Sequence, residues 1–337
     1  MSQPAASRII DVVTSVWQHA LNRPSVGVRD NFFETGGDPR AAAELFCEIE
    51  RTLGRYVPPM MIYHTPTIIS LTEALQDSGF PQIPPLTQLR PGENRAPLFI
   101  AHGVGGSVLE FSDLVKHVDS GRAIYGMQAK GSDGRSEPLD RIEDMAEFHL
   151  EAIRRLQPHG PYFLAGHSLG GLVALEIARR VLESGDNPGL LVMIDSYPHL
   201  RHLAPSQQAR LIARLAARRV FGANAPPANA APKHQNKNTT HLEVPTNVKT
   251  PMRRVRERGY VALERYRPRF YDGKIHFVRA ETVSVFPDDP TAVWSRFAKE
   301  FELETVPGDH FGMLTTYVET LAAILSRYAR EWDDSAL

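Results

Sequence analysis

The sequence predicts a mostly parallel, doubly wound α/β domain preceded by a small helical bundle. From about residue 97 onward, short apolar runs typical of buried strands alternate with helical patterns, and this alternation favours a parallel sheet. Residues 1–79 show helical periodicity alone. The length of 337 residues fits roughly two domains, each large enough to bury a core.

The helical bundle is predicted from three stretches in which apolar residues recur at helical spacing. Asp38 is a suitable cap for the second helix, and Pro39 is tolerated at a first helical position. A Pro-rich and Gly-containing stretch without periodicity follows, so residues 80–96 are predicted to be an interdomain linker. The three helices are predicted over residues 9–21, Pro39–Leu53 and Ile68–Gln76.

The second domain is predicted over residues 97–332. The apolar runs PLFIA and AIYGM each lead into a glycine-containing turn, as buried strands do. The helices and strands after these two runs alternate regularly, with one long interruption. They are predicted as a helix over Ile142–Leu156, a strand over 162–165, a helix over 172–182, a strand over Leu190–Ile194, the strand KIHFVRA, and a final helix over 317–329.

The interruption covers residues 199–269 and is predicted to be a lid. It holds fifteen Lys and Arg against three Asp and Glu, whereas the formal net charge of the chain is -1. Residues 1–79 are mildly acidic, with six basic and nine acidic residues. A lid this basic is a candidate docking surface for an acidic protein or a phosphate. The alternatives are a solvated lid whose arginines keep it soluble, and a helix that binds a membrane surface.

The composition excludes several classes of protein and site. Cys47 is the only cysteine, so intrachain disulfides and cysteine metal clusters are excluded. Because Cys47 lies among Leu45, Phe46 and Ile49, we expect a buried structural thiol. No apolar signal-peptide region and no apolar run of about 18 residues is present, so we expect a cytoplasmic protein without a membrane span. Nothing in the composition indicates nucleic-acid binding.

The motif AGHSLGG matches Gly-x-Ser-x-Gly with Gly166, Ser168 and Gly170, and it stands between a predicted strand and a predicted helix. A serine at such a sharp turn has a strained backbone, and side chains two residues away on either side would crowd it. The turn exposes the Ser168 hydroxyl, and the following helix N-terminus favours negative charge there. Ser168 is therefore the predicted nucleophile.

A serine nucleophile needs an imidazole base and an acid that orients it, in the chain order serine, acid, histidine. His310, in the loop GDHFGML, is the candidate base, because the other histidines after Ser168 lie beside a strand, inside a strand or in the insertion. Asp195 ends a predicted strand at its carboxyl end, where open parallel sheets bind ligands. That position favours Asp195 as the acid, with Asp288 and Asp289 as alternatives after a later strand.

The glycine-rich segment HGVGG, residues 102–106, follows the first strand of the second domain. Such a turn can present the backbone N–H of Val104 beside that of Leu169, the residue after the nucleophile. Two N–H groups placed in this way stabilise the oxyanion of an acyl-transfer intermediate. The alternative is a simple tight loop. The predicted chemistry requires no metal and no cofactor.

These residues resemble a known arrangement, a carrier domain followed by a type I thioesterase at the end of nonribosomal peptide and polyketide synthetases. The segments PLFIAHGVGGS, YFLAGHSLGGLVALEIA, LLVMIDSYP and GDHFGML look like those of the thioesterase in the same order. The resemblance implies an α/β-hydrolase fold with a helical lid over an acyl channel. The interval from Ser168 to Asp195 also matches the usual spacing, which strengthens Asp195 over Asp288.

The segment DNFFETGGDPRAA looks like a carrier protein of the same systems, in which a serine bears the phosphopantetheine arm. Pro39 stands in place of that serine and Arg40 in place of the apolar residue after it. The resemblance therefore implies a carrier-like domain that cannot be loaded, with phosphopantetheine only on a partner's carrier. We expect a serine-dependent thioesterase that hydrolyses or cyclises an acyl or peptidyl group. The alternatives are a stand-alone esterase or acyl-CoA hydrolase, and a noncatalytic docking protein.

Overall fold

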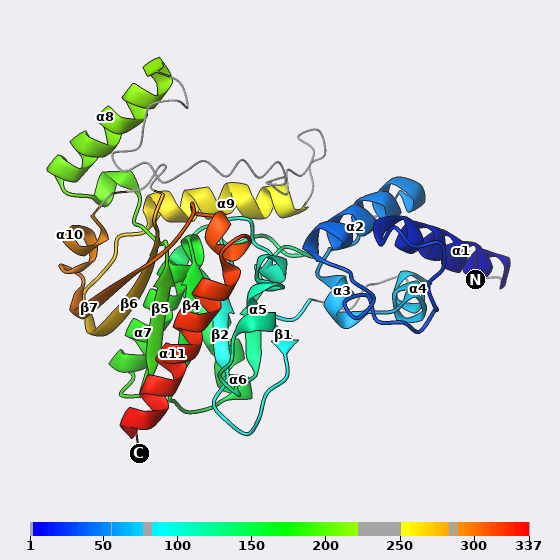
Figure 1. Cartoon of the computed structure of the whole chain (residues 1–337), viewed down its shortest axis with the longest axis horizontal. Coiled ribbons are helices and arrows are strands. Elements are labelled where there is room, and N and C mark those ends of the chain that lie inside the picture. The colour runs from blue at the N-terminus through cyan, green and yellow to red at the C-terminus, as the bar shows by residue number, and fades with distance from the viewer. Residues whose placement is uncertain are drawn as a thin grey trace.

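The computed structural model describes residues 3–54, 56–76, 83–221, 251–282, 287 and 289–336. These residues form a helical unit and a larger domain in which helices cover a seven-stranded sheet (Figure 1). None of the helices in these described ranges combines the length and the hydropathy that crossing a bilayer requires. The predicted two-part architecture is confirmed, and the larger part is the α/β domain.

The helical unit is built around a core of large apolar side chains. Trp17 and Phe32 are fully buried, and their rings meet edge to face with centroids 5.2 Å apart. Asp38 caps α2, because its carboxylate accepts a hydrogen bond of 2.7 Å from the Ala41 N–H. Pro39 is the first residue of that helix. The helices are α1 (Gln3–Ala20), α2 (Pro39–Leu53), α3 (Met61–His64) and α4 (Ile68–Gln76).

The expectation of a buried thiol at Cys47 is wrong, since Cys47 is exposed. Leu45, Phe46 and Ile49 are buried on one face of α2, and a residue between them at position 47 falls on the opposite face. Proximity in sequence to apolar residues was therefore a poor guide to burial on this helix.

The strands form one sheet in the order β1-β3-β2-β4-β5-β6-β7. All neighbouring strands pair in parallel except β1 and β3, which pair antiparallel at one edge. This arrangement brings the carboxyl ends of the central strands to one edge of the sheet, where ligands of such sheets bind. The strands are β1 (Leu86–Arg90), β2 (Leu98–Ala101), β3 (Ile124–Met127), β4 (Phe163–His167), β5 (Leu190–Ile194), β6 (Tyr271–Ala280) and β7 (Ala298–Val306).

Part of the segment predicted to be a linker is a strand. Residues 86–90 form β1, and the register pairs Leu86 with Met127 and Thr87 with Gly126. The prolines at positions 84, 85 and 91 flank this strand and favour a loop in a pattern-based prediction. Because β1 lies at the edge of the sheet, prolines beside it remove no hydrogen bond from a central ladder.

Helices cover both faces of the sheet. Along β4, Phe163 and Ala165 belong to one apolar cluster with residues of α11, whereas Leu164 belongs to a second cluster with residues of α7. Successive side chains of β4 thus point to opposite faces of the sheet, and both faces are buried. The helices of this domain are α5 (Leu114–His117), α6 (Ile142–Leu156), α7 (Leu169–Glu183), α8 (Pro205–Phe221), α9 (Pro251–Arg265), α10 (Pro290–Trp294) and α11 (Val318–Ala336), with short 3-10 turns η1 (Val108–Phe111), η2 (Leu200–His202) and η4 (Gly312–Leu314).

Two helices, α8 and α9, lie within the segment predicted to be a lid, and residues 222–250 of that segment lie outside the described residues. Figure 1 shows α9 crossing above the sheet. The face of α9 that carries Val255, Gly259 and Ala262 is buried against the domain. Ion pairs hold its other side, with Arg254 2.6 Å from Glu137 and Arg258 3.1 Å from Asp140. The helix is thus packed and ion-paired onto the sheet domain.

Candidate active site

The turn around Ser168 has the strained geometry that its glycines predict. Ser168 has φ 57 and ψ -120, a combination that L residues rarely adopt, and its side chain is partly exposed. A Cβ on Gly166 would lie 2.1 Å from the Gly170 oxygen, and one on Gly170 would lie 2.2 Å from the Ala101 oxygen. Only glycine fits at either position, so the sequence of this turn is explained by the close approach of β2, β4 and α7.

His310 and Asp195 meet at the same edge of the sheet. The His310 Nδ1 lies 2.7 Å from Asp195 Oδ2, and both side chains are buried. The other carboxylate oxygen of Asp195 accepts a hydrogen bond of 3.3 Å from the Ala280 N–H. His310 reaches the serine turn as well, since its ring stacks on His167 with centroids 4.3 Å apart. The structure therefore brings the predicted base and acid together beside the turn that bears the predicted nucleophile.

The alternative acids do not share this position. Asp289 is exposed and caps α10, with its carboxylate accepting a hydrogen bond of 2.9 Å from the Ala292 N–H. Asp288 lies outside the described residues. Asp195 is thus the carboxylate that geometry favours as the partner of His310.

The environment of His310 favours a neutral imidazole. Burial lowers the pKa of His310, the neighbouring His167 lowers it further, and the hydrogen bond with Asp195 opposes both effects. The net pKa lies below the ordinary histidine value, so the ring is unprotonated near pH 7. An unprotonated imidazole next to a serine hydroxyl can accept its proton.

Val104 and Leu169 lie close together beneath α9. A Cβ on Gly259 would lie 3.1 Å from Val104 Cγ2 and 3.4 Å from Leu169 Cδ1. Leu169 is the first residue of α7, where the N–H has no partner within the helix. The Val104 N–H makes no backbone hydrogen bond to another described residue. Two N–H groups at this place remain available for an oxyanion.

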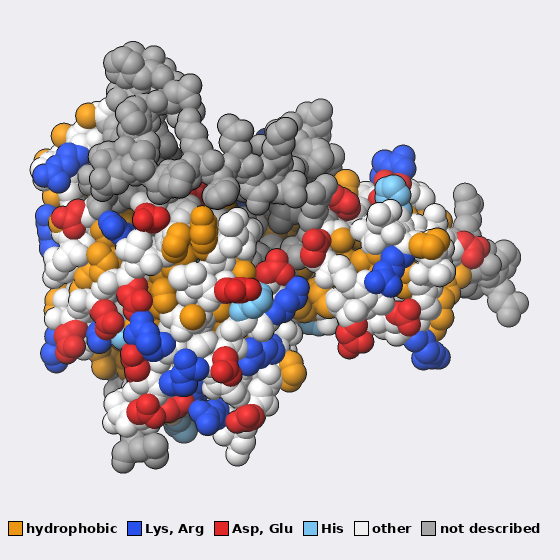
Figure 2. All heavy atoms as spheres, viewed as in Figure 1, with side chains coloured by type: hydrophobic (Ala, Val, Ile, Leu, Met, Phe, Trp, Pro, Cys, Tyr) orange, Lys and Arg blue, Asp and Glu red, His pale blue; other side chains and the backbone are white. Residues whose placement is uncertain are grey.

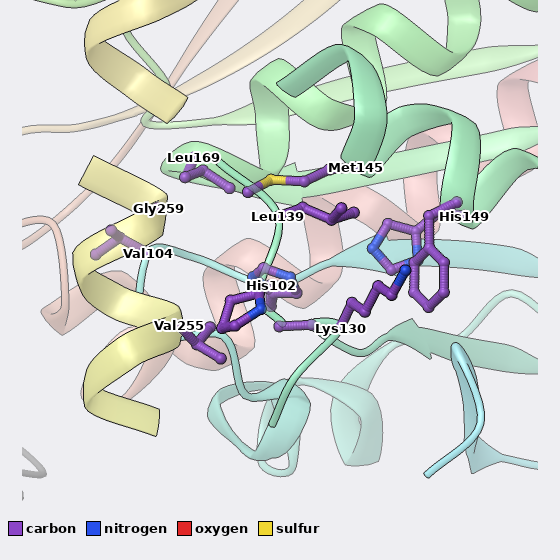
Figure 3. A pocket seen from close by; sticks show the side chains of 12 residues that line it. His102, Val104, Lys130, Leu139, Met145, His149, Leu169, Val255 and Gly259 are labelled. Atoms are coloured by element: carbon purple, nitrogen blue, oxygen red, sulfur yellow. The ribbon is translucent and has the colours of Figure 1, made fainter. Parts of the chain in front are cut away.

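A pocket extends from these two residues. Figure 3 shows Leu169, Val104 and Val255 toward one end, with His149 and Lys130 at the other. Burial lowers the pKa of His149 to about 3, so this ring is neutral at pH 7. The pocket is therefore lined by apolar side chains near the candidate oxyanion site, and at its far end His149 and Lys130 lie beside the ring of Phe148.

Two residues that support the site were missed by the sequence reasoning. Gln128 is 1% exposed, and its side chain donates to the Gly106 oxygen at 2.7 Å and accepts from the Val108 N–H at 3.3 Å. Glu110 accepts a hydrogen bond of 2.5 Å from the Gly103 N–H. Both side chains hold the loop that bears Val104. The signal for Gln128 was a polar residue at the end of an apolar strand run, because a buried amide requires partners.

Comparison with known families gives two matches. The family model for the thioesterase domain matches residues 96–330, and the family model for the phosphopantetheine attachment site matches residues 11–75. Among curated relatives, a dimodular nonribosomal peptide synthase of Bacillus subtilis (strain 168) is 34% identical over 210 residues, which is 61% of this chain and 9% of that protein. Indigoidine synthase of Dickeya dadantii (strain 3937) is 34% identical over 190 residues, with 56% and 13% covered. The chain thus spans a small part of the length of these relatives.

Solved structures share the fold. A four-domain nonribosomal peptide synthetase, holo-AB3403 bound to AMP and glycine, matches with a TM-score of 0.58 and 23% identity, over 95% of this chain and 26% of that one. The type II thioesterase BorB, from the borrelidin biosynthetic cluster, matches with a TM-score of 0.54 and 20% identity, over 72% and 97%. At these identities the likeness shows the fold, which is the α/β-hydrolase fold of thioesterases.

Proposed function

This chain belongs to the thioesterase domain family, with a carrier-type domain before it, and on that premise we propose that it cleaves an acyl or peptidyl thioester through an acyl-enzyme on Ser168. The observation that carries the proposal is the buried pair of His310 and Asp195, joined at 2.7 Å beside the strained serine turn. A base held in one orientation next to an accessible hydroxyl is the requirement for nucleophilic serine chemistry, and Ser168 is partly exposed.

The proposed reaction has two halves. The Ser168 oxygen attacks the thioester carbonyl carbon while His310 takes the hydroxyl proton, and the N–H groups of Val104 and Leu169 bind the oxyanion. The C–S bond then breaks, and His310 protonates the departing thiolate. In the second half, His310 removes a proton from water, or from a hydroxyl or amine of the acyl chain itself, and that group attacks the acyl carbon. The bond to the Ser168 oxygen then breaks, and His310 returns the proton to that oxygen. Asp195 stabilises the imidazolium in both halves. No cofactor takes part.

The proposal is tested by the intact mass of the wild type and of Ser168→Ala after brief exposure to short acyl-pantetheine thioesters. We expect an added acyl mass on the wild type alone, or free acid released by the wild type alone. The two proteins differ by one oxygen atom, so any difference between them reports the hydroxyl. Equal release by both proteins, or neither adduct nor release, would contradict the proposal for these substrates.

The acyl group is proposed to come from another protein. Pro39 stands where carriers of this family have the phosphopantetheine serine, so this chain has no hydroxyl there to be loaded. The arrangement of α2 agrees with this proposal. Tyr56 follows the end of α2, and its hydroxyl donates a hydrogen bond of 3.0 Å to the Ser132 oxygen of the sheet domain. Figure 1 shows α2 extending away from the sheet domain. At about 1.5 Å per residue, Pro39 lies about 20 Å along the helix from that contact.

The lid is the proposed docking surface for the partner carrier. Ile212 on α8 and Tyr260 on α9 are 54% and 58% exposed, and Arg210 and Arg267 are exposed near them in sequence. Exposed apolar and arginine side chains together are typical of interface surfaces. The ion pairs of α9 neutralise part of the positive charge that the sequence predicts. On the face of the molecule shown in Figure 2, basic and acidic side chains are interspersed over the described surface.

The partner proposal predicts different salt dependence for two substrates. Turnover of an acyl group on a separate, acidic carrier protein is expected to fall several-fold between low salt and about 0.5 M salt, because charge attraction is screened. Turnover of a small neutral acyl-pantetheine is expected to change little. The mass of the unaltered chain should also stay constant after exposure to a phosphopantetheinyl transferase and coenzyme A. Loading of the unaltered chain, or equal salt dependence of both substrates, would contradict the proposal.

A further inference from the structure

The helical unit and the sheet domain share a packed interface. Met60 and Met61 of the helical unit belong to the same buried cluster as Val108, Leu109 and Phe111 of the sheet domain. All five side chains are at most 3% exposed. A mobile carrier that shuttles between sites needs a surface from which it can separate, whereas this unit is packed against the segment η1. The contact therefore indicates a fixed position.

Hydrogen bonds from the helical unit hold both ends of η1. The Ser107 hydroxyl donates to Met60 Sδ at 3.4 Å, and the Tyr63 hydroxyl lies 2.7 Å from Ser112 Oγ. Ser112 donates its single hydroxyl hydrogen to the Leu109 oxygen at 2.7 Å, so Tyr63 is the donor to Ser112. Because Ser107 and Ser112 flank η1, a shift of the helical unit would move the turn between them.

The turn η1 carries Glu110, whose carboxylate faces two parts of the candidate active site. One oxygen accepts the Gly103 N–H at 2.5 Å, and Gly103 directly precedes Val104. The other oxygen lies 3.8 Å from His167 Nδ1, and His167 directly precedes Ser168 and stacks on His310. The His167 Nδ1 is buried without a hydrogen-bond partner among the described residues. One side chain thus stands between the oxyanion loop and the nucleophile turn.

We propose that Glu110 is a positioning residue for the acyl-transfer site, and that the helical unit acts as a fixed brace that holds Glu110 in place through η1. The inference rests on the proposed function of Ser168. It gives the carrier-like domain a role that needs no phosphopantetheine and so accommodates Pro39. The charge-assisted hydrogen bond to Gly103 fixes the direction of the Val104 N–H, and small displacements of such donors reduce the rate of the chemical step.

The role of Glu110 is tested by comparing Glu110→Ala with Glu110→Gln. Alanine removes the acceptor for the Gly103 N–H, so kcat is expected to fall about tenfold with little change in KM. Glutamine keeps an acceptor oxygen and is expected to restore most of kcat. A fall of equal size in both variants, or no fall in Glu110→Ala, would overturn the positioning role.

The glutamine variant also has a signature in the pH profile. Among the described residues, the titratable groups that act on the pKa of His310 are Asp195, His167 and Glu110, and the carboxylate of Glu110 raises that pKa. Removing that negative charge lowers the pKa of the imidazolium, so the acid limb of kcat/KM should move to lower pH in Glu110→Gln. An acid limb that does not move in Glu110→Gln would show that the Glu110 carboxylate does not act on His310.

The brace is tested with two tyrosine variants of the full chain. Tyr63→Phe removes the hydrogen bond to Ser112, whereas Tyr56→Phe removes the bond of the same unit to the Ser132 oxygen, which lies outside η1. We expect faster amide hydrogen exchange in peptides covering residues 103–112, and a several-fold lower kcat, in Tyr63→Phe alone. Thermal midpoints should fall by similar amounts in both variants.

Hydrogen exchange tests, independently of activity, whether the helical unit acts as a brace for η1. If Tyr63→Phe exchanges like the wild type over residues 103–112, or if Tyr56→Phe gives the same change, the brace is overturned even when turnover depends on Ser168. If the wild type shows no turnover that depends on Ser168, the proposed function fails, while faster exchange in Tyr63→Phe alone would still support the mechanical coupling.

Discussion

Replacing Asp195 by asparagine is expected to lower kcat by about 10⁴-fold while the protein remains folded. The two side chains have nearly the same shape, so the packing around the buried site is kept. What changes is the group that faces His310. Asp195 Oδ2 accepts the hydrogen of Nδ1 at 2.7 Å, which leaves Nε2 unprotonated and available as a base.

The surrounding hydrogen bonds fix which way the asparagine would turn. The Asp195 Oδ1 accepts from the Ala280 N–H at 3.3 Å, and an amide oxygen would keep that acceptor position. The amide NH₂ would then face His310 Nδ1 and donate to it. The hydrogen of the imidazole would move to Nε2, the wrong nitrogen for a general base.

The measurement is kcat for an acyl-pantetheine thioester, with Asp289→Asn as the matched control. Asp289 was one of the two alternative acids in the sequence, and it is exposed at the cap of α10. We expect the control to retain wild-type kcat. The wild type should also gain kcat/KM as pH rises through a pKa below 6.5, because burial lowers the pKa of His310 and the unprotonated ring is the active form. Wild-type activity in Asp195→Asn, or a large loss in Asp289→Asn, would refute the assignment of the acid.

The sequence predicted the elements whose pattern is set by burial alone. The helices Pro39–Leu53 and Ile142–Leu156 and the strand Leu190–Ile194 have their predicted bounds, because each buries one stripe or both faces in a common core. The edge strand β1 was missed since only one neighbour pairs with it, and the pairing of Leu86 with Met127 joins residues distant in sequence. Short edge strands give little periodicity from which to predict them.

Parts of the candidate site could be predicted where the local backbone geometry permits only one residue type. The glycines around Ser168 are such a case, because close backbone contacts exclude any side chain. Glu110 could not be predicted, since its role depends on the meeting of Gly103 and His167, which lie on different segments of the chain. Contacts of this kind arise from the fold and leave no local pattern.

The charge counted in residues 199–269, the segment predicted to be a lid, shows the same limit of reasoning from sequence alone. The excess of arginine in residues 199–269 was counted correctly, yet Arg254, Arg258 and Arg265 pair with Glu137 and Asp140, which lie outside that window. Counting the charges within one segment overstates its positive electrostatic potential when the acidic partners of its arginines lie elsewhere in the chain.

Glu176→Gln is expected to lower the thermal midpoint of the sheet domain by about 10 °C, which corresponds to a loss of about 3–5 kcal/mol. Glu176 is fully buried on α7 and lies 2.7 Å from Arg179, 3.1 Å from Arg180 and 3.0 Å from Arg269. The Tyr266 hydroxyl is 3.4 Å from the same carboxylate. An amide has no charge to balance these guanidinium groups and offers one acceptor oxygen in place of two.

The stability lost in Glu176→Gln should depend on pH, and the pKa of Glu176 sets the direction. Burial raises the pKa of Glu176, but hydrogen bonds from Arg179 and Arg180 outweigh it, so the pKa lies below the ordinary value of 4.5. A depressed carboxyl pKa contributes stability that is present above that ordinary value and is lost as pH falls through the folded-state pKa. The difference in midpoint between the wild type and Glu176→Gln should therefore be largest near pH 7 and shrink in acid.

The matched control is Glu147→Gln, since Glu147 pairs with the same Arg180 from the surface, where it is 54% exposed. Exposed pairs contribute about 0–1 kcal/mol, so the midpoint of this variant should move by less than about 3 °C. Differential scanning calorimetry across pH separates the two. Equal shifts of the thermal midpoint in both variants, or a shift in Glu176→Gln that does not shrink in acid, would contradict the stabilising role of the buried Glu176 ion pairs. Because Tyr266 directly follows α9, its contact with Glu176 also joins the end of α9 to α7.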